Sequence, residues 1–416
     1  MIFWICTISV VCIITGVIFC KPYLGIAFVI VSIPFEGSMI FDGIPIYPLE
    51  AVLAILVFTC VVKRLIRKEV FLNNAKFALY YTPFMLCILI SALKSIEFSL
   101  TVKEIVRWVE LIAVYLLAIN LITDYKKVRV ILYSMVLSTI VVSICGISSY
   151  LAGVERVYIG RPGAYSFFGH PNALAGYVSL IIPVLFGMLV TSVYLWEQIT
   201  LGAFTVLSIM AWFLTFSRTA WISLVLAIFF IFILAKVKKR VAILFVMIFV
   251  IFAITFLSSN IKDDFKDRFI LNEAVFRVML YPIGFNMVKE DLLFGIGIGN
   301  YPLLIKNFTE SPAVIKNDLH GLYLQIFVET GIIGLCAFLF WLMFIIQYLV
   351  RSMKSLERSR YYGLFVGLLG GVIVYLINNL ANVLTVHGIH LQWGIILGLA
   401  VLVTRFREPE TCSETV

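Results

Sequence analysis

His320 is the side chain in this sequence best suited to moving a proton. It stands two residues after Asp318, at the start of the long apolar run in NDLHGLYLQIFVETGIIGL (317–335). An imidazole gains or loses a proton near neutral pH, and a nearby carboxylate can hold the ring in one tautomer. His320 is therefore a candidate general base. The structural alternative is a polar anchor where the chain enters a helix.

Arg218 has the surroundings of an anion-binding residue. In FSRTAWISL it follows Ser217 between two apolar runs, with no acidic residue within twenty positions along the chain. An ionised guanidinium near a bilayer is costly unless it is paired or lines a polar cavity, and its planar fork fits phosphate oxygens. We expect Arg218 to hold a phosphate or diphosphate, with Ser217 beside it, unless the side chain only extends to the lipid headgroups.

Three further arginines have a similar character. Arg161 lies in GRPGAYSFFGHPNALAGY, Arg277 in EAVFRVMLY, and Arg107 in TVKEIVRWVEL near the start of an apolar run. Several arginines facing one side of the membrane indicate an anionic ligand there. Arg107 has a simpler alternative, because Glu104 and Glu110 each stand about one helical turn away from it.

Other polar features have weaker chemical meaning. Glu329 falls inside the apolar run that follows His320, where a carboxylate must face protein or water, so it is a candidate supporting residue or a structural partner of an arginine. The segment FGIGIGN (294–300) is either a flexible turn or a backbone nest for an anion, and it lacks the preceding strand of a nucleotide site. His387 and His390 share a helical face without a third ligand nearby, so no metal site is expected.

The elements that carry these residues are predicted to be transmembrane helices. The chain has 416 residues, of which 62% are hydrophobic and 13% charged, and its mean hydropathy is +1.08, as in integral membrane proteins. We expect an all-α polytopic fold in a single transmembrane domain, 1–416. About twelve apolar runs are long enough to span a bilayer, near 2–20, 49–62 with its flanks, 77–93, 105–122, 128–152, 173–195, 198–216, 219–235, 241–257, 321–349, 361–382 and 388–404. The shorter run at 22–34 would add a thirteenth helix if it forms one.

Basic residues predict the orientation of these helices. The net charge of +9 reflects how the chain is oriented in the membrane, and contact with membrane lipids accounts for it. The sequence has no basic patch interleaved with aromatic residues, so it does not indicate nucleic-acid binding. The alternate loops, including a long one at 258–320, would lie outside, where surface helices in the long loop cover the enclosed site. The positive-inside rule assigns to the cytoplasm the connections 63–76, 124–129, 236–240 and 351–360 and the tail at Arg405 and Arg407, which hold more than half of the 32 Lys and Arg.

The motifs in their order resemble the O-antigen ligase and O-antigen polymerase superfamily of bacterial membrane glycosyltransferases. The similarity rests on FFGHPNALAGY, SRTAWISL, GIGIGNY and DLHGLYLQIFVETGIIGL, which are spread over roughly residues 30 to 400. The resemblance implies about twelve helices with both termini in the cytoplasm. It also implies that His320 is the general base, that Ser217 and Arg218 are the family's Ser-Arg pair, and that Arg277 is its loop arginine.

The resemblance further implies a reaction in cell-surface polysaccharide biosynthesis. The donor would be a glycan on undecaprenyl diphosphate at the outer face of the bacterial cytoplasmic membrane, and the acceptor a hydroxyl of a sugar chain or lipid. His320 would take the hydroxyl proton, and Arg218, Arg277 and Arg161 would hold the departing diphosphate, with Arg107 as a further supporting residue. No metal ion and no cofactor is expected. Polymerase and ligase share these motifs, so both remain open.

A transporter or flippase of lipid-linked oligosaccharides is the alternative from another functional class. Its outer arginines would bind an anionic cargo transiently, and polar residues would continue across the membrane to a cytoplasmic exit. The runs 198–235 and 241–257 are nearly free of charge in their inner halves. This pattern favours a site on one side of the membrane, and hence the glycosyltransferase.

Overall fold

Helices make up nearly all of the regular structure. In the computed structural model, the only strands among the described residues form a short antiparallel hairpin of β1 (Met39–Phe41) and β2 (Ile44–Ile46). The predicted all-α membrane fold is confirmed in this main feature, and the hairpin is a small departure from it. The structure describes residues 2–35, 39–41, 44–46, 48–67, 76–153, 163–235, 272–310, 319–385 and 388–406.

Each apolar run that falls within the described residues contains a helix. The uncertain run at 22–34 forms a helix of its own, whereas the run at 241–257 lies outside the described residues. The helices are α1 (Ile2–Cys20), α2 (Pro22–Ser32), α3 (Pro48–Arg67), α4 (Lys76–Ser91), α5 (Phe98–Leu121), α6 (Tyr125–Leu151), α7 (Pro171–Thr191), α8 (Leu195–Phe213), α9 (Arg218–Ala235), α12 (Asn272–Met287), α13 (Tyr301–Leu304), α15 (Leu322–Leu356), α16 (Tyr362–Asn378) and α17 (Ile389–Val403).

Four segments of the described chain are long and apolar enough to cross a membrane: Phe77–Lys94, Tyr125–Leu151, Pro171–Thr191 and Leu322–Leu356. Other apolar helices, among them α16 and α17, are shorter. Many large apolar side chains on the outer helices are exposed, as expected for surfaces that face lipid. The number of twelve membrane crossings stays a prediction.

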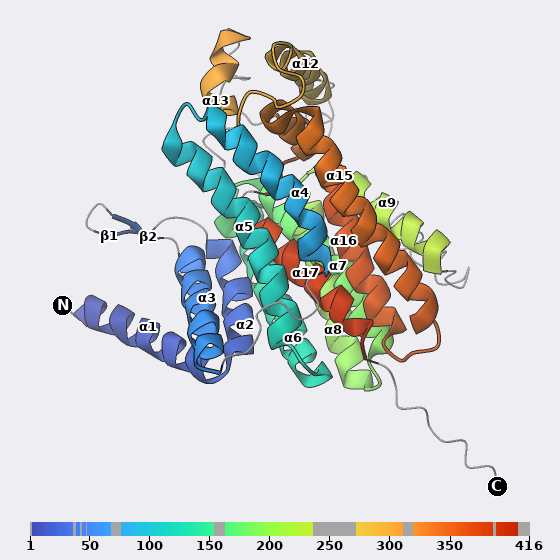
Figure 1. The fold of residues 1–416 in the computed structure, drawn as a ribbon. Coiled ribbons are helices and arrows are strands. Elements are labelled where there is room, and N and C mark those ends of the chain that lie inside the picture. Colours follow the sequence, from blue (N-terminus) through green and yellow to red (C-terminus); the bar gives the residue numbers. More distant parts are fainter. Residues whose placement is uncertain are drawn as a thin grey trace.

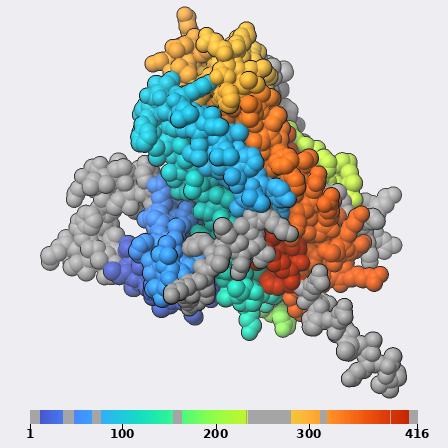
Figure 2. Space-filling view, in the orientation of Figure 1, coloured from blue at the N-terminus to red at the C-terminus, as the bar shows by residue number. Residues whose placement is uncertain are grey.

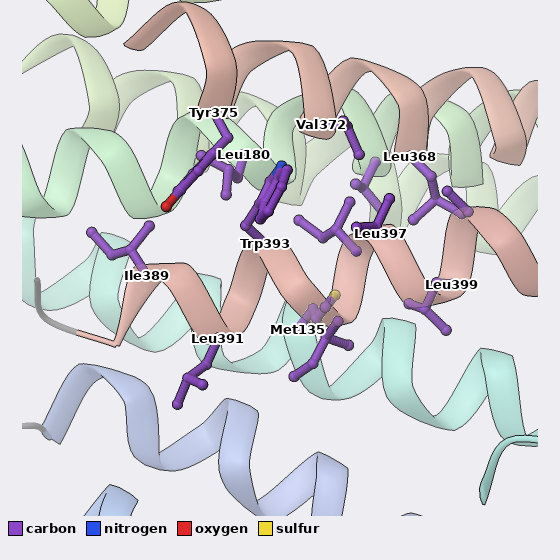
Figure 3. Close-up of a cluster of buried hydrophobic side chains, with 14 of the residues drawn as sticks. Met135, Leu180, Leu368, Val372, Tyr375, Ile389, Leu391, Trp393, Leu397 and Leu399 are labelled. Carbon is purple, nitrogen blue, oxygen red and sulfur yellow. The ribbon is translucent and has the colours of Figure 1, made fainter. Parts of the chain in front are cut away.

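Helices α7 and α17 form the centre of the bundle (Figure 1). Every residue of α17 is buried. Figure 3 shows its Trp393 beside Tyr375 of α16, and the two rings stack with centroids 4.6 Å apart. Leu180 of α7 and Met135 of α6 belong to the same apolar cluster. The core therefore joins helices that are far apart in sequence.

Glycines allow α7 and α16 to pack closely. A Cβ atom added to Gly367 of α16 would lie 2.4 Å from the carbonyl oxygen of Pro183, and one added to Gly187 of α7 would lie 2.7 Å from that of Gly363. Small residues at such crossings let helix backbones approach each other in membranes. This contact fixes α16 against the most buried part of the bundle, and thereby fixes the end of α16 that reaches the site.

Helices α12 and α13 cap one end of the molecule. Figure 1 shows α12 and α13 above the upper ends of α5 and α15, and Figure 2 shows the same segment covering that end. Within the predicted loop at 258–320, residues 258–271 and 311–318 lie outside the described residues. The expected helix in this segment is present as α12, and its position on a membrane surface stays a prediction.

Candidate active site

The chain bends sharply at His320, just before α15. His320 is half-buried and has a φ of +49°, a left-handed conformation that is uncommon for residues other than glycine. The next residue, Gly321, is the N-cap of α15. Such a conformation costs about 1–2 kcal/mol and persists only where the surrounding structure enforces it. The backbone therefore holds the imidazole at a defined position.

A second left-handed residue precedes the Ser-Arg pair. Phe216 has a φ of +56°, Ser217 is buried, and its backbone N–H donates to Thr215 Oγ1 at 3.3 Å. Arg218 is half-buried and is the first residue of α9. The positive end of a helix dipole disfavours a cation and favours an anion. Arg218 and the start of α9 thus form a region of positive potential.

Asparagines at the end of α16 connect the two motifs. Asn378 Nδ2 donates to Ser223 Oγ of α9 at 3.2 Å, and Asn382 Nδ2 donates to Asn378 Oδ1 at 2.7 Å. At the start of α15, the Leu322 N–H donates to the carbonyls of Asn379 and Asn382 at 2.9 and 3.1 Å. Residues 378–382 therefore join the helix that begins with the Ser-Arg pair to the helix that follows the histidine.

Sequence reasoning missed this asparagine bridge. The signal was present as INNLAN (377–382), three amide side chains at the end of an apolar run. All three asparagines are almost completely buried. Amides are costly inside a membrane protein unless they are hydrogen-bonded, so such a cluster indicates a polar interior that bridges helices.

Glu329 lies at a break in α15. Gly331 has φ +69° and ψ −172° inside the helix, so the local helical hydrogen bonds are interrupted. At the break, the buried carbonyls of Val328 and Glu329 accept from the N–H groups of Ile296 and Gly297, at 2.9 and 3.1 Å. The glycine-rich turn therefore replaces the missing helical partners, a requirement for broken helices at membrane depth.

The glycine-rich turn is a structural clamp, because most of its N–H groups bind acceptors of the protein itself and are not available to an anion from outside. The N–H groups of Gly295, Ile296 and Gly297 donate to backbone carbonyls, and that of Gly299 donates to Glu329 Oε1 at 3.2 Å. These donors are thus used inside the protein. The turn is also tied to the end of the α4 segment, where Lys94 Nζ donates to the Gly295 carbonyl at 2.6 Å.

Arg107 forms an ion pair with Glu104 on α5, as its simpler alternative predicted. Together with Gln325 and Glu329 of α15, this pair lines a small cleft of about 60 Å³ beside Gly299 of the clamp. The structure thus brings Arg107 and Glu329 together, 222 positions apart in sequence. Gln325 is a further residue that sequence reasoning did not assign to the site.

The other arginines and histidines considered from the sequence either lie away from the asparagine bridge and the clamp or fall outside the described residues. Arg161 and His387 lie outside the described residues, and Arg277 lies in α12 with a side chain that is not described. His390 is buried in α17, with Nε2 3.5 Å from Glu110 Oε2. His170 caps α7 through Nδ1, which accepts the Asn172 N–H at 3.1 Å. Among the described residues, no group of three or more His, Cys, Asp or Glu is placed to hold a metal ion.

A family model described as O-antigen ligase matches residues 203–339. Over this segment the chain is similar to the O-antigen ligase and polymerase superfamily. The matched segment contains the Ser-Arg pair, the clamp, His320 and the break in α15, so the predicted resemblance is confirmed over the part of the chain that carries these features. The O-antigen ligase match implies a glycosyltransferase-type enzyme with a membrane role in O-antigen assembly. No curated protein matches the chain.

Proposed function

We propose that this protein transfers a glycan from undecaprenyl diphosphate to a hydroxyl acceptor at the outer face of the bacterial cytoplasmic membrane. The observation that carries the proposal is the bridge at 378–382, which joins the helices of Arg218 and His320 within a chain similar to the O-antigen ligase superfamily. A phosphate-binding group and a proton acceptor at one polar end of a bundle are what such a transfer needs.

In the proposed reaction the acceptor oxygen attacks the anomeric carbon of the donor sugar. Its proton passes to His320, and the new glycosidic C–O bond forms as the bond between the anomeric carbon and the diphosphate oxygen breaks. The electron pair of that bond leaves with the diphosphate, whose added charge Arg218 stabilises. Arg277 and Arg161 are proposed to contribute further positive charge, and Ser217 to position the diphosphate.

The membrane arrangement is part of the proposal. All 416 residues would form one transmembrane domain of about twelve helices. The segment 258–320 would lie outside the cytoplasm and cover the site, and the lipid carrier would reach the site through the membrane. Glu329 and Arg107 would shape the wall of the site from α15 and α5.

Transfer by purified protein in nanodiscs tests the role of His320. The donor is undecaprenyl-diphosphate-linked oligosaccharide, and product length is read on a gel. His320→Asn is the cleanest variant, because asparagine tolerates a left-handed φ and so preserves the bend while removing the base. General base catalysis contributes roughly 10²–10⁴-fold in rate, so we expect a loss of at least about 100-fold. Wild-type rates in this variant would contradict the assignment.

Arg218→Lys tests the phosphate clamp. Lysine keeps the charge and loses the two-pronged geometry, so we expect a rise in donor KM and only partial activity. Arg351→Lys, at an exposed position near the far end of α15, is the matched control and should leave transfer unchanged. A ladder of longer lipid-linked chains would indicate a polymerase, and full-length transfer to a different acceptor a ligase. Absence of any histidine-dependent product would favour transport.

A further inference from the structure

Ser223 of α9 is fully buried and has two hydrogen-bond partners. Its hydroxyl donates to the carbonyl of Ala220, in the first turn of the same helix, at 2.9 Å. A carbonyl oxygen can only accept, so the hydroxyl proton is directed at Ala220 and Oγ accepts from Asn378 Nδ2 at 3.2 Å. The serine therefore connects the first turn of α9 to the end of α16.

Two asparagines continue this connection to α15. Because Asn378 donates to Ser223 through Nδ2, its Oδ1 is left to accept, and it does so from Asn382 Nδ2 at 2.7 Å. The backbone carbonyl of Asn382 accepts the Leu322 N–H at 3.1 Å. Ser223, Asn378 and Asn382 thus form one hydrogen-bonded relay, which runs from the carbonyl of Ala220 to the N–H of Leu322.

The relay begins and ends beside the two proposed reacting groups. Ala220 lies two residues after Arg218, and Leu322 lies two residues after His320. In the proposed transfer the anomeric carbon lies between the diphosphate at Arg218 and the hydroxyl group that His320 deprotonates. The separation of the two helix starts therefore sets the geometry of the attack.

The relay is shielded from solvent and anchored on a helix that is itself fixed. Ser223 and Asn378 are 0% exposed and Asn382 is 4% exposed, so water does not compete for these hydrogen bonds. Helix α16 is held against α7 by the close contact at Gly367. Because α16 bonds to both α9 and α15, it holds the starts of these two helices at one separation.

We propose that Ser223, Asn378 and Asn382 are positioning residues of the transfer reaction, which act through Arg218 and His320 by holding them at the separation that the attack requires. The inference rests on the proposed function, which places the diphosphate at Arg218 and the proton at His320. It gives a role to Ser223, the second serine of SRTAWISL. A displacement of about 1 Å at such a site can lower the rate by about 100-fold.

Ser223→Ala breaks the relay with the smallest change of side chain. Transfer is measured in nanodiscs, and kcat is expressed per donor-binding site, counted by calorimetry without acceptor. We expect kcat to fall about 10- to 100-fold, while the KM for donor stays within about twofold of the wild-type value. Ser223→Thr keeps the hydroxyl and should recover most of the lost kcat. A purely structural role would lower the number of donor-binding sites and leave kcat per site unchanged.

Ser179→Ala is the matched control. Ser179 of α7 is also 0% exposed, and its hydroxyl donates to the carbonyl three residues earlier at the same distance of 2.9 Å. Among the described residues it has no second hydrogen-bond partner, so this variant loses the bond within its helix and leaves the relay intact. Equal kcat in Ser223→Ala and Ser179→Ala would overturn the proposal. So would a loss in Ser223→Thr as large as that in Ser223→Ala.

Amide hydrogen exchange tests the relay without turnover. The peptide at the start of α15 contains the Leu322 N–H, and we expect it to exchange at least about threefold faster in Ser223→Ala than in Ser179→Ala. Equal exchange would overturn the proposal even in a protein that transfers no glycan. If wild type shows no histidine-dependent transfer, the proposed function fails and the positioning role fails with it. An active wild type with equal kcat in the two serine variants refutes the positioning role alone.

Discussion

Replacing Gly331 by alanine should show how strongly the clamp stabilises the protein. With φ +69° and ψ −172°, Gly331 occupies a region of backbone space that is essentially restricted to glycine. A Cβ atom at this position would lie 2.2 Å from the carbonyl oxygen of Leu293 and 2.6 Å from the backbone nitrogen of Phe294. Both neighbours are backbone atoms, so either α15 or the glycine-rich turn must move.

The cost follows from these contacts. Backbone strain of this kind is worth about 1–3 kcal/mol, and shifting the turn weakens at least two hydrogen bonds, those from Ile332 N–H to the Leu292 carbonyl at 3.0 Å and from Ile296 N–H to the Val328 carbonyl at 2.9 Å. At about 0.5–1.5 kcal/mol for each bond, the free energy of unfolding should fall by about 2–6 kcal/mol. With an unfolding entropy of roughly 2.1 cal/mol/K per residue, this corresponds to a decrease in Tm of about 2–7 °C.

Gly202→Ala provides the matched control. Gly202 lies inside α8, and an added Cβ would have no atom within 4 Å, so alanine should stabilise the helix by about 0.5–1 kcal/mol. Tryptophan fluorescence during heating in detergent measures both Tm values. If Gly331→Ala unfolds at or above the wild-type temperature, the clamp is not the rigid element described here.

Three further perturbations test other parts of the structure. Asn379→Leu removes the side-chain oxygen that accepts the Leu384 N–H. The buried N–H is then without its acceptor, so the free energy of unfolding should fall by about 1–3 kcal/mol, measured as a lower Tm than wild type. The pKa of Asp291 is lowered from its ordinary 3.8, first by the hydrogen bond from Lys94, so this ion pair stabilises above pH 4 and is lost as the pH falls through the lower pKa of the folded state. Asp291→Asn should therefore flatten the acid side of a Tm-against-pH curve, and a curve identical to wild type would contradict this role. Gly367→Leu forces a side chain against the carbonyl of Pro183 and should abolish the monodisperse peak in size-exclusion chromatography, whereas normal elution would show that α7 and α16 can separate.

Short-range sequence features were predictable because their physical causes are local. Apolar runs longer than a membrane's hydrocarbon core must form helices to satisfy their backbone groups, and each of these runs that falls within the described residues contains a helix. Asp124 caps α6 by accepting the N–H of Lys127 at 3.0 Å, as an aspartate before a helix should. His320 and Arg218 could be selected as candidate site residues because they are polar residues at the ends of apolar runs.

The tertiary structure decided what depends on contacts between distant segments. The run 321–349 reads as one continuous helix, and only the fold shows that it breaks at Gly331, because the hydrogen bonds that permit the break come from a turn more than thirty residues earlier. The segment GIGIGN is a second example. Its sequence is compatible with N–H groups that bind an anion, and only the fold shows that carbonyls of the protein accept from them. Local pattern cannot reveal which partner satisfies a buried group.

The sequence by itself determined that this chain is rich in apolar helices and similar to O-antigen ligases, with a histidine and an arginine at helix starts. Only the tertiary structure decided that the asparagines at 378–382 join those two starts, and that Gln325 and Glu329 meet Glu104 and Arg107 around a cleft. The physical reason is the range of the interactions. Hydropathy and capping act within a few turns of helix, whereas each of these polar contacts joins residues from helices far apart in the chain, and only packing of the bundle brings them within hydrogen-bonding distance.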